Sequence, residues 1–148
     1  MTTLHHEIYI NAPVKDVWVL LADLEKVAEY NPVVAKARYI SSNREGIGAA
    51  RQCEFKPKGS GKERVFEWKP EEVIGIELYE HQWPVKIMRW WTKVRPDGNG
   101  TLVTQDLEYE MKFGILGKIM DALAMRRKLD QGVSEIFAGL KQFVEKQR

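Results

Sequence analysis

The middle of the sequence constrains the fold most, because about eighty residues alternate as strands do, with turn chemistry between the runs. The breaks contain REGIG, KPKGSG, KPEE, QWP and RPDGNG. PDGNG is the strongest hairpin signal, because Asp-Gly and Asn-Gly adopt positive φ at little cost. The expected strands are 34–41, 49–56, 63–69, 73–82, 85–95 and 101–113.

The two ends of the sequence supply the remaining elements. Residues 4–11 alternate as a strand with one buried face. Two short helices are expected next, one capped by Asn11 with Pro13 in its first turn, and one over 24–29 capped by Asp23. A long helix runs from Leu116, and its apolar stripe at three-to-four spacing is Ile119, Met120, Leu123, Val133, Phe137, Leu140 and Val144.

This order of elements predicts an α+β fold in one domain over residues 1–148. Strands joined by short turns become antiparallel neighbours. A sheet of seven strands has one large apolar face to cover, and the C-terminal helix is the only long element available. We therefore expect a seven-stranded antiparallel sheet curled around that helix, with the two short helices closing one end.

Alternation along the expected strands assigns side chains to the inner face of the sheet. Trp91 then faces outward, where the stems of basic neighbours cover its ring. A concave apolar volume with a few polar groups is the usual composition of a small-molecule site, although complete filling by these side chains is the alternative. The inward set is Ile74, Ile76, Leu78, Glu80, Met88, Trp90, Thr92, Val94, Val103, Gln105, Leu107, Tyr109 and Met111.

Arg51 shares the expected buried face of its strand with Cys53 and Phe55. A buried arginine needs a carboxylate or an anionic ligand group. A structural ion pair and a ligand anchor therefore both stay open for Arg51. The carboxylates on nearby strands are Glu54, Glu63 and Glu67.

Three stretches carry a family resemblance: EIYINAPVKDVWVLLADLEKVAEYNPVV, GIGAARQCEF, and the run from RPDGNG to LKQF. They resemble the polyketide cyclase/dehydrase and lipid-transport group of the START-like (SRPBCC) superfamily, which includes the birch-pollen allergen. The resemblance covers nearly the whole chain. It implies a helix-grip fold that encloses a cavity for a hydrophobic ligand. Family members bind lipids, sterols, quinones, polyketides or plant hormones, and some catalyse polyketide cyclisation or dehydration.

We expect the protein to bind a hydrophobic small molecule or lipid between the sheet and the C-terminal helix, with Arg51, Gln105 and Tyr109 orienting it. The expected ligand wall is Leu78, Met88, Trp90, Leu107, Tyr109, Met111, Met120 and Leu123. The alternative is a polyketide cyclase, aromatase or dehydratase using the same cavity, with Tyr109 and Arg51 or Glu80 as its best polar groups and its catalytic residues unknown. A third hypothesis is an interaction module that uses exposed Trp83 and Trp91.

Net charge, cysteine content and the absence of targeting signals limit which partners and cellular locations are expected. The net charge of +2 offers no strong field for nucleic acid or anionic lipid. The single cysteine, Cys53, excludes an intramolecular disulfide and fits a reducing cytoplasm. No secretion signal, membrane-spanning segment or stable membrane insertion is expected, and the chain is expected to be a monomer or weak dimer.

Neither a metal nor a cofactor is expected. His5 and His6 are adjacent on a strand and point to opposite faces, so they do not chelate one ion. Glu80 and His81 likewise diverge, which favours a surface pair over a catalytic one. On the helix, Arg126 and Asp130 have the spacing of a surface ion pair.

Overall fold

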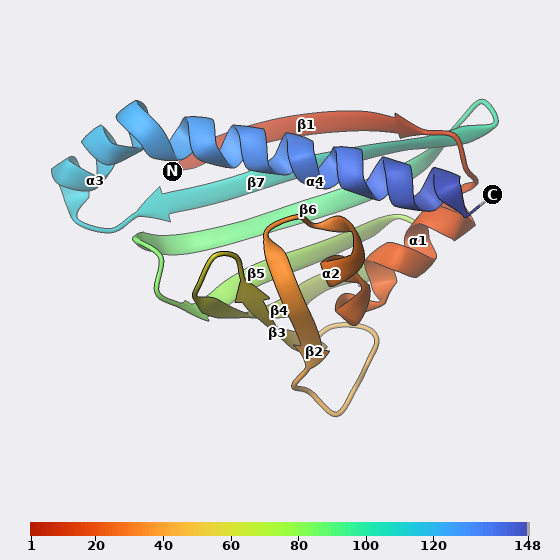
Figure 1. Cartoon of the computed structure of the whole chain (residues 1–148), viewed down its shortest axis with the longest axis horizontal. Helices are drawn as coiled ribbons and strands as arrows, with labels where there is room; N and C mark the ends of the chain where they lie inside the picture. The colour runs from red at the N-terminus through yellow and green to blue at the C-terminus, as the bar shows by residue number, and fades with distance from the viewer. Residues whose placement is uncertain (148) are drawn as a thin grey trace.

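The structure, a computed structural model, describes residues 1–147. Seven antiparallel strands form one sheet, and a long C-terminal helix lies along it (Figure 1). In chain order the elements are β1 (Thr2–Ile10), α1 (Val14–Ala22), η1 (Leu24–Lys26), α2 (Val27–Tyr30), β2 (Val34–Tyr39), β3 (Ala50–Phe55), β4 (Ser60–Lys69), β5 (Val73–His81), β6 (Val85–Asp97), β7 (Gly100–Met111), α3 (Gly114–Met120), η2 (Asp121–Met125) and α4 (Arg126–Lys146).

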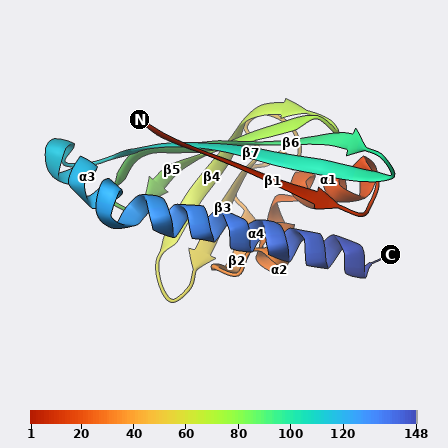
Figure 2. The same ribbon diagram turned by 90° about the horizontal axis from the view of Figure 1, so that it is seen from above.

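The strand order across the sheet is β1-β7-β6-β5-β4-β3-β2. After β1 the chain passes through α1, η1 and α2 to the opposite edge, and short turns then return it strand by strand until β7 pairs with β1. Figure 2 shows the sheet curving about the long helix, with α1 toward the C-terminal end of that helix and α2 beside β2. The predicted helix-grip architecture is confirmed.

Local turn and cap chemistry sets several boundaries. At the tip of the β6–β7 hairpin Asp97 pairs with Gly100, and Gly98 has a φ of +59°, so the predicted PDGNG turn is confirmed. The Asp23 side chain accepts from the Glu25 N–H at 3.2 Å, as a capping residue does. The cap expected of Asn11 is wrong, because Pro13 holds the N-cap position and no side chain among residues 1–147 caps α1.

Two strand details also differ from the expectation. β4 begins at Ser60 rather than at residue 63, because the Phe55 N–H donates to the Gly59 carbonyl at 2.8 Å and shortens the turn. Glu80 points outward to Lys62 rather than inward, with 3.1 Å between the charged atoms. A bulge where β4 pairs with β5 skips one residue and inverts the alternation there.

The C-terminal helix departs most from its predicted stripe. Val133, Phe137, Leu140 and Val144 are buried as expected, but Met120 and Leu123 are exposed. Between α3 and α4 the segment η2 is π-helical, and its wider turn keeps a face of four-residue spacing toward the sheet. The side chains on that face are Asp121, Met125, Leu129 and Val133, preceded by Gly117.

The buried core has two parts. The larger one joins the short helices and the second half of α4 to the sheet, with Val17, Trp18, Leu20 and Leu21 from α1 and Phe137, Leu140 and Val144 from α4. The smaller one lies toward α3 and consists of Leu4, Leu78, Val85, Met88, Leu107, Tyr109 and Val133. Only Val133 of the helix is buried in this second part, so the sheet has less helical cover there.

Two glycines of α4 give a matched test of how closely this helix packs. A Cβ on Gly139 would lie 2.1 Å from the Tyr30 carbonyl oxygen, whereas a Cβ on Gly132 would meet nothing within 4 Å. Gly139→Ala should therefore lower the free energy of unfolding by about 1–3 kcal/mol. Gly132→Ala should raise it by about 0.5–1 kcal/mol, because alanine is the better helix former. Urea denaturation measures both, and equal effects of the two changes would contradict this packing of α4 on α2.

Candidate functional site

The candidate site is built on three rows of side chains that cross the inner face of the sheet. Strand register places Leu4, Leu107 and Trp90 side by side in the central row, continued by Ile76. The row on the α3 side is Thr2, Tyr109, Met88 and Leu78, and the row on the α1 side is His6, Gln105, Thr92 and Ile74. The inner face thus carries a central apolar strip. Hydroxyl groups lie on its α3 side, and hydroxyl, amide and imidazole groups lie on its α1 side.

Several inward side chains in this region are only half-buried. Trp90 lies at the junction of the two core clusters and stays partly accessible, as do Gln105 and Met111. On the helix, Met125 and Leu129 pack against the second cluster and are also half-buried. A complete helical cover would leave these side chains as buried as Leu107 and Met88.

The residues predicted for the ligand wall divide into two groups. Leu78, Met88, Trp90, Gln105, Leu107, Tyr109 and Met111 all lie on the inner face, as the alternation predicts. Met120 and Leu123 do not, because they are 44% and 77% exposed on the side of the helix away from Asp121. Their expected place in the wall is wrong, since the four-residue spacing of the packed face excludes both positions.

Asp121 of η2 connects the helix to the end of the inner face. Its carboxylate accepts from the Tyr109 hydroxyl, and its other oxygen accepts from the Thr2 hydroxyl at 2.7 Å. Burial and then the bond to Asp121 raise the pKa of Tyr109, so its phenol stays protonated and donates. Sequence analysis does not single out Asp121. Its position four residues after Gly117 and four before Met125 would have indicated that it shares the packed face of the helix.

His6 and Asp130 form a second connection between the inner face and the helix. The His6 Nε2 atom lies 2.8 Å from an Asp130 carboxylate oxygen. Asp130 therefore pairs with His6 and not with Arg126, which corrects the surface ion pair expected on the helix. The His6 Nδ1 atom is buried and has no hydrogen-bond partner among residues 1–147. In the same row, the Gln105 amide donates to the Thr92 hydroxyl at 3.2 Å.

Arg51 is buried in an ion pair with Glu63. Its Nε and Nη2 atoms lie 2.7 and 2.6 Å from one Glu63 oxygen, and its Nη1 donates to the Leu24 carbonyl at 3.1 Å. The pair forms because Arg51 and Glu63 are direct partners in the β3–β4 register. Burial alone would lower the arginine pKa, but the adjacent carboxylate raises it, so Arg51 stays charged.

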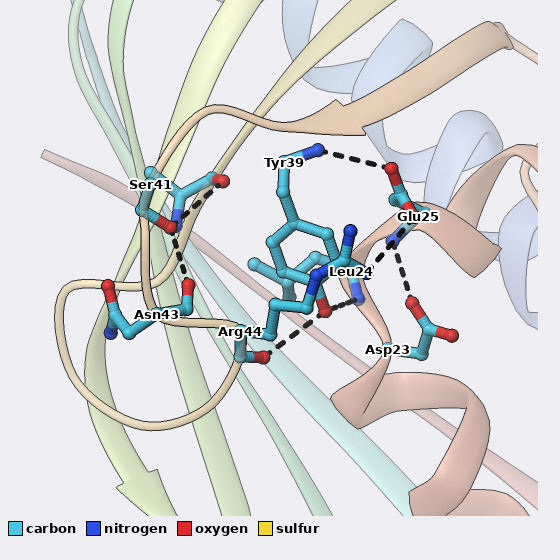
Figure 3. Close-up of polar contacts among 8 residues, drawn as sticks. Asp23, Leu24, Glu25, Tyr39, Ser41, Asn43 and Arg44 are labelled. Carbon is cyan, nitrogen blue, oxygen red and sulfur yellow. Dashed lines mark hydrogen bonds and ion pairs between the residues drawn. The ribbon is translucent and has the colours of Figure 1, made fainter.

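Figure 3 shows the contacts that fix the backbone at Leu24. The Leu24 carbonyl accepts the hydrogen bond from Arg51 Nη1. The Leu24 N–H donates to the Tyr39 hydroxyl at 2.9 Å, and that hydroxyl donates to the Arg44 carbonyl at 3.2 Å. The Glu25 carboxylate accepts from the Tyr39 N–H and lies 3.5 Å from the Arg44 guanidinium. Helix η1, strand β2 and the following loop thus hold one buried acceptor in place.

The thiol and phenol groups next to this ion pair stay protonated and are unreactive near neutral pH. Burial, followed by the negative charge of Glu63, raises the pKa of the Cys53 thiol to about 12. Burial also raises the pKa of Tyr30 to about 12. Neither group is ionised near neutral pH, so the arrangement around Arg51 supports structure more than nucleophilic chemistry.

The two other tryptophans singled out from the sequence lie in different places: Trp91 is on the outer face of the sheet, and Trp83 packs against both core clusters. Trp91 faces outward as predicted, with its Nε1 donating to Glu67 at 3.0 Å and the Arg89 guanidinium 5.4 Å from its ring centre. Trp83 packs on Phe55, with 4.9 Å between ring centres. Neither tryptophan is exposed, which contradicts the third hypothesis, an interaction surface built on Trp83 and Trp91, and agrees with the covered ring expected for Trp91.

No metal or membrane-spanning feature stands out in the part of the chain that the structure describes. Among residues 1–147 no three His, Cys, Asp or Glu side chains are grouped to hold a metal ion. No helix within that range is long and apolar enough to cross a membrane. His81 accepts from the Trp83 N–H at 3.1 Å, and its pKa is lowered by burial and by the charge of Lys112.

Two surface hollows lie away from the inner-face rows. One is on the outer side of the sheet around Glu67, Lys93 and Thr104. The other lies between α2 and α4, around Tyr30 and Gly139. Neither hollow includes a residue of the predicted ligand wall.

Comparison with known proteins places this geometry in a wider group. Residues 1–145 match the family model described as polyketide cyclase/dehydrase and lipid transport. A search of curated proteins finds no significant match.

Solved structures repeat the whole fold. TTHA0849 from Thermus thermophilus is 24% identical, with 99% of each chain covered and a TM-score of 0.82. CV1439 from Chromobacterium violaceum is 18% identical over 97% of this chain and 96% of that one, with a TM-score of 0.75. Ara h 8.0201 is 11% identical over 98% of each chain, with a TM-score of 0.76. At these identities the likeness establishes the fold.

The buried Arg51–Glu63 pair gives a stability test. Glu63→Gln leaves a buried arginine without its counter-charge and should lower the free energy of unfolding by about 3–5 kcal/mol. The apolar double variant Arg51→Met/Glu63→Leu should lose much less, because no charge stays buried. The exposed Arg64–Glu77 pair on neighbouring strands is the control, and Glu77→Gln should cost less than about 1 kcal/mol. Equal losses for Glu63→Gln and Glu77→Gln in urea denaturation would contradict the assignment.

Cys53 reports on the same region without a mutation. Its thiol is buried and its pKa is raised to about 12, so little thiolate exists near neutral pH. The native protein should react with Ellman's reagent only as fast as it opens, whereas the protein in denaturant should react at once. Rapid and complete labelling of the folded protein would mean that β3 is not covered as described.

Proposed function

The chain belongs to the polyketide cyclase/dehydrase and lipid transport family, and we propose that it binds an apolar small molecule against the inner face of its sheet. The observation that carries the proposal is the partial exposure of inward side chains, Trp90 and Met111 above all, where α4 leaves them half-covered. A ligand that covers such apolar surface makes the binding free energy more favourable by about 25 cal/mol for each Å² removed from water.

The composition of the strip supports a ligand of irregular shape. Met88 and Met111 of the sheet face the same cluster as Met125 of the helix. Methionine side chains are unbranched and polarisable, so they adapt to different apolar surfaces. A ligand between sheet and helix would displace these flexible side chains rather than enter a rigid, preformed hole.

The polar groups beside the strip supply orientation. Gln105 is half-buried and its amide is held by Thr92, so it presents a fixed hydrogen-bonding group beside the apolar row, whereas Tyr109 is fully buried and bonded to Asp121. Arg51 is different, because its nitrogens are engaged by Glu63 and the Leu24 carbonyl. We therefore assign Arg51 a structural role, keep Tyr109 as part of the ligand wall, and leave ligand orientation to Gln105.

The two adjacent tryptophans of β6 give a matched test of ligand binding. Protein purified from its own host and measured by native mass spectrometry should carry a small-molecule adduct. Trp90→Ala removes the side chain that spans the apolar strip and should abolish the adduct. Trp91→Ala, on the outer face of the same strand, should keep it, since that ring contacts Phe66 and Glu67 instead. Circular dichroism checks that both variants fold.

The apolar probe 1-N-phenylnaphthylamine extends the test to protein that has lost its ligand. Its fluorescence should rise with the wild type and with Trp91→Ala, and should rise at least about tenfold less with Trp90→Ala. Loss of both signals in Trp91→Ala but not in Trp90→Ala would place the ligand on the outer face and overturn the proposal.

A second candidate function, proton-transfer catalysis on the bound molecule, is favoured by the His6–Asp130 pair. A carboxylate 2.8 Å from Nε2 fixes the imidazole, and the buried Nδ1, which has no partner among residues 1–147, offers a hydrogen bond to a ligand group. Cyclisation or dehydration of a polyketide needs such a group beside an apolar site.

The adduct itself distinguishes the two functions. For an enzyme that dehydrates its substrate, His6→Gln should accumulate the unreacted substrate, so its adduct should be one water heavier than that of the wild type. For a binding protein, the adduct mass should be the same in both proteins. Identical masses would exclude dehydration through His6; cyclisation alone conserves mass and would be excluded by identical chromatographic retention of the two released ligands.

A further inference from the structure

A group of large apolar side chains lies exposed around α3 and η2. We call it the α3 patch, and its members, 44–78% exposed, are Phe113, Ile115, Leu116, Ile119, Met120 and Leu123. Isolated exposed apolar residues are ordinary, but six within eleven positions concentrate exposed apolar area on one short segment, as interaction sites do.

The position of α3 explains why the patch has no internal cover. Figures 1 and 2 both place α3 at the end of the molecule opposite α1, beyond the sheet. Gly117 and Asp121 turn the other side of this segment toward β7 and β1: a Cβ on Gly117 would lie 2.0 Å from the Lys112 carbonyl, and Asp121 bonds Tyr109 and Thr2. The patch therefore faces away from the protein.

Positive charge surrounds the patch. Residues 112–128 hold five of the 23 basic residues and one of the 21 acidic residues, so this segment carries +4 while the rest of the chain carries −2. The one acid, Asp121, is turned inward in hydrogen bonds. None of the five cations forms an ion pair with the residues that the structure describes, and these cations are Lys112, Lys118, Arg126, Arg127 and Lys128.

The near-neutral net charge therefore conceals a strong asymmetry. The expectation that the chain offers no field to anionic lipid holds for its total charge of +2 and fails for this end of the molecule. Apolar side chains flanked by lysine and arginine on one helical segment are the composition of helices that lie in a lipid interface.

We propose that the α3 patch docks the protein onto the surface of an anionic lipid bilayer. Leu116, Leu123 and their apolar neighbours enter the boundary between headgroups and acyl chains, and the five cations contact the anionic headgroups. The protein lies on the membrane without crossing it. Docking at α3 is independent of the ligand proposed for the inner face, because it uses the opposite side of the helix.

A second copy of the chain fits this surface less well. A two-fold dimer through the α3 patch would bring the same five cations of each copy together, and Asp121, the one acid of residues 112–128, is turned inward in each copy. The cores of protein–protein interfaces are also depleted in lysine. The charge of this surface is complementary to an anionic membrane and not to itself.

Flotation with lipid vesicles tests the proposal on the purified full chain. Wild-type protein should float with vesicles of phosphatidylcholine mixed with phosphatidylserine, and much less with phosphatidylcholine alone. Raising the salt concentration should weaken the binding, because the headgroup contacts are screened. Absence of flotation with the anionic vesicles at low salt would overturn the proposal.

Matched variants distinguish binding through the α3 patch from non-specific adsorption of the protein to vesicles. Leu116→Gln/Leu123→Gln should lower the vesicle partition coefficient by at least about tenfold, since two exposed apolar side chains no longer enter the interface. Ile47→Gln, which changes an equally exposed residue in the loop between β2 and β3, should leave it unchanged. Arg127→Gln/Lys128→Gln should remove the preference for phosphatidylserine.

Two other outcomes would also overturn membrane docking. One is vesicle binding that Leu116→Gln/Leu123→Gln leaves intact. The other is a wild-type dimer in light scattering that this double variant converts to a monomer, with no flotation of either protein; the patch would then be an interface between copies. Because the assay uses vesicles and protein only, its result does not depend on whether the inner face binds a ligand.

Discussion

The width of one helix relative to the width of its sheet is the constraint on which the rest of this structure depends. An α-helix with its side chains is about 10–12 Å across. Seven strands spaced at about 4.8 Å span roughly 29 Å, so a single helix does not cover their inner face. The sheet curls, and α1 and α2 cover the end near the second half of α4. At the α3 end only Val133 of the helix is buried in the core, and the inner face there stays half-covered.

Three connections decide where the helix leaves that face open. Gly139 allows α4 to approach the Tyr30 backbone, and Asp130 and Asp121 tie the helix to His6 and Tyr109. The two carboxylates therefore position the helix and orient polar groups of the candidate site at the same time. The same geometry turns the apolar side of α3 away from the sheet, which links the proposed ligand site to the proposed membrane-docking surface through one helix.

The sequence predicts side-chain facing correctly in most of the strands, where the period is two residues. It fails at the start of the C-terminal helix, where the helical period changes along the chain. Strand alternation has a period of two, so the inward facing of Met88, Trp90, Leu107 and Tyr109 follows directly from the sequence. The helix has a period near 3.6, and a π-helical segment shifts its face, so Met120 and Leu123 were assigned to the wrong side. The partners of Arg51 and His6 depend on strand register and on helix placement, which no local pattern contains.

The five methionines allow one measurement to test the central claim, that an apolar ligand binds between the sheet and the helix. With ¹³C-labelled methionine methyl groups, addition of 1-N-phenylnaphthylamine should shift the NMR signals of Met88, Met111 and Met125, which face the inner cluster. The signals of Met1 and Met120, both exposed, should stay in place. Shifts confined to Met1 and Met120, or no shift at Met88 and Met111 when the probe binds, would contradict the account.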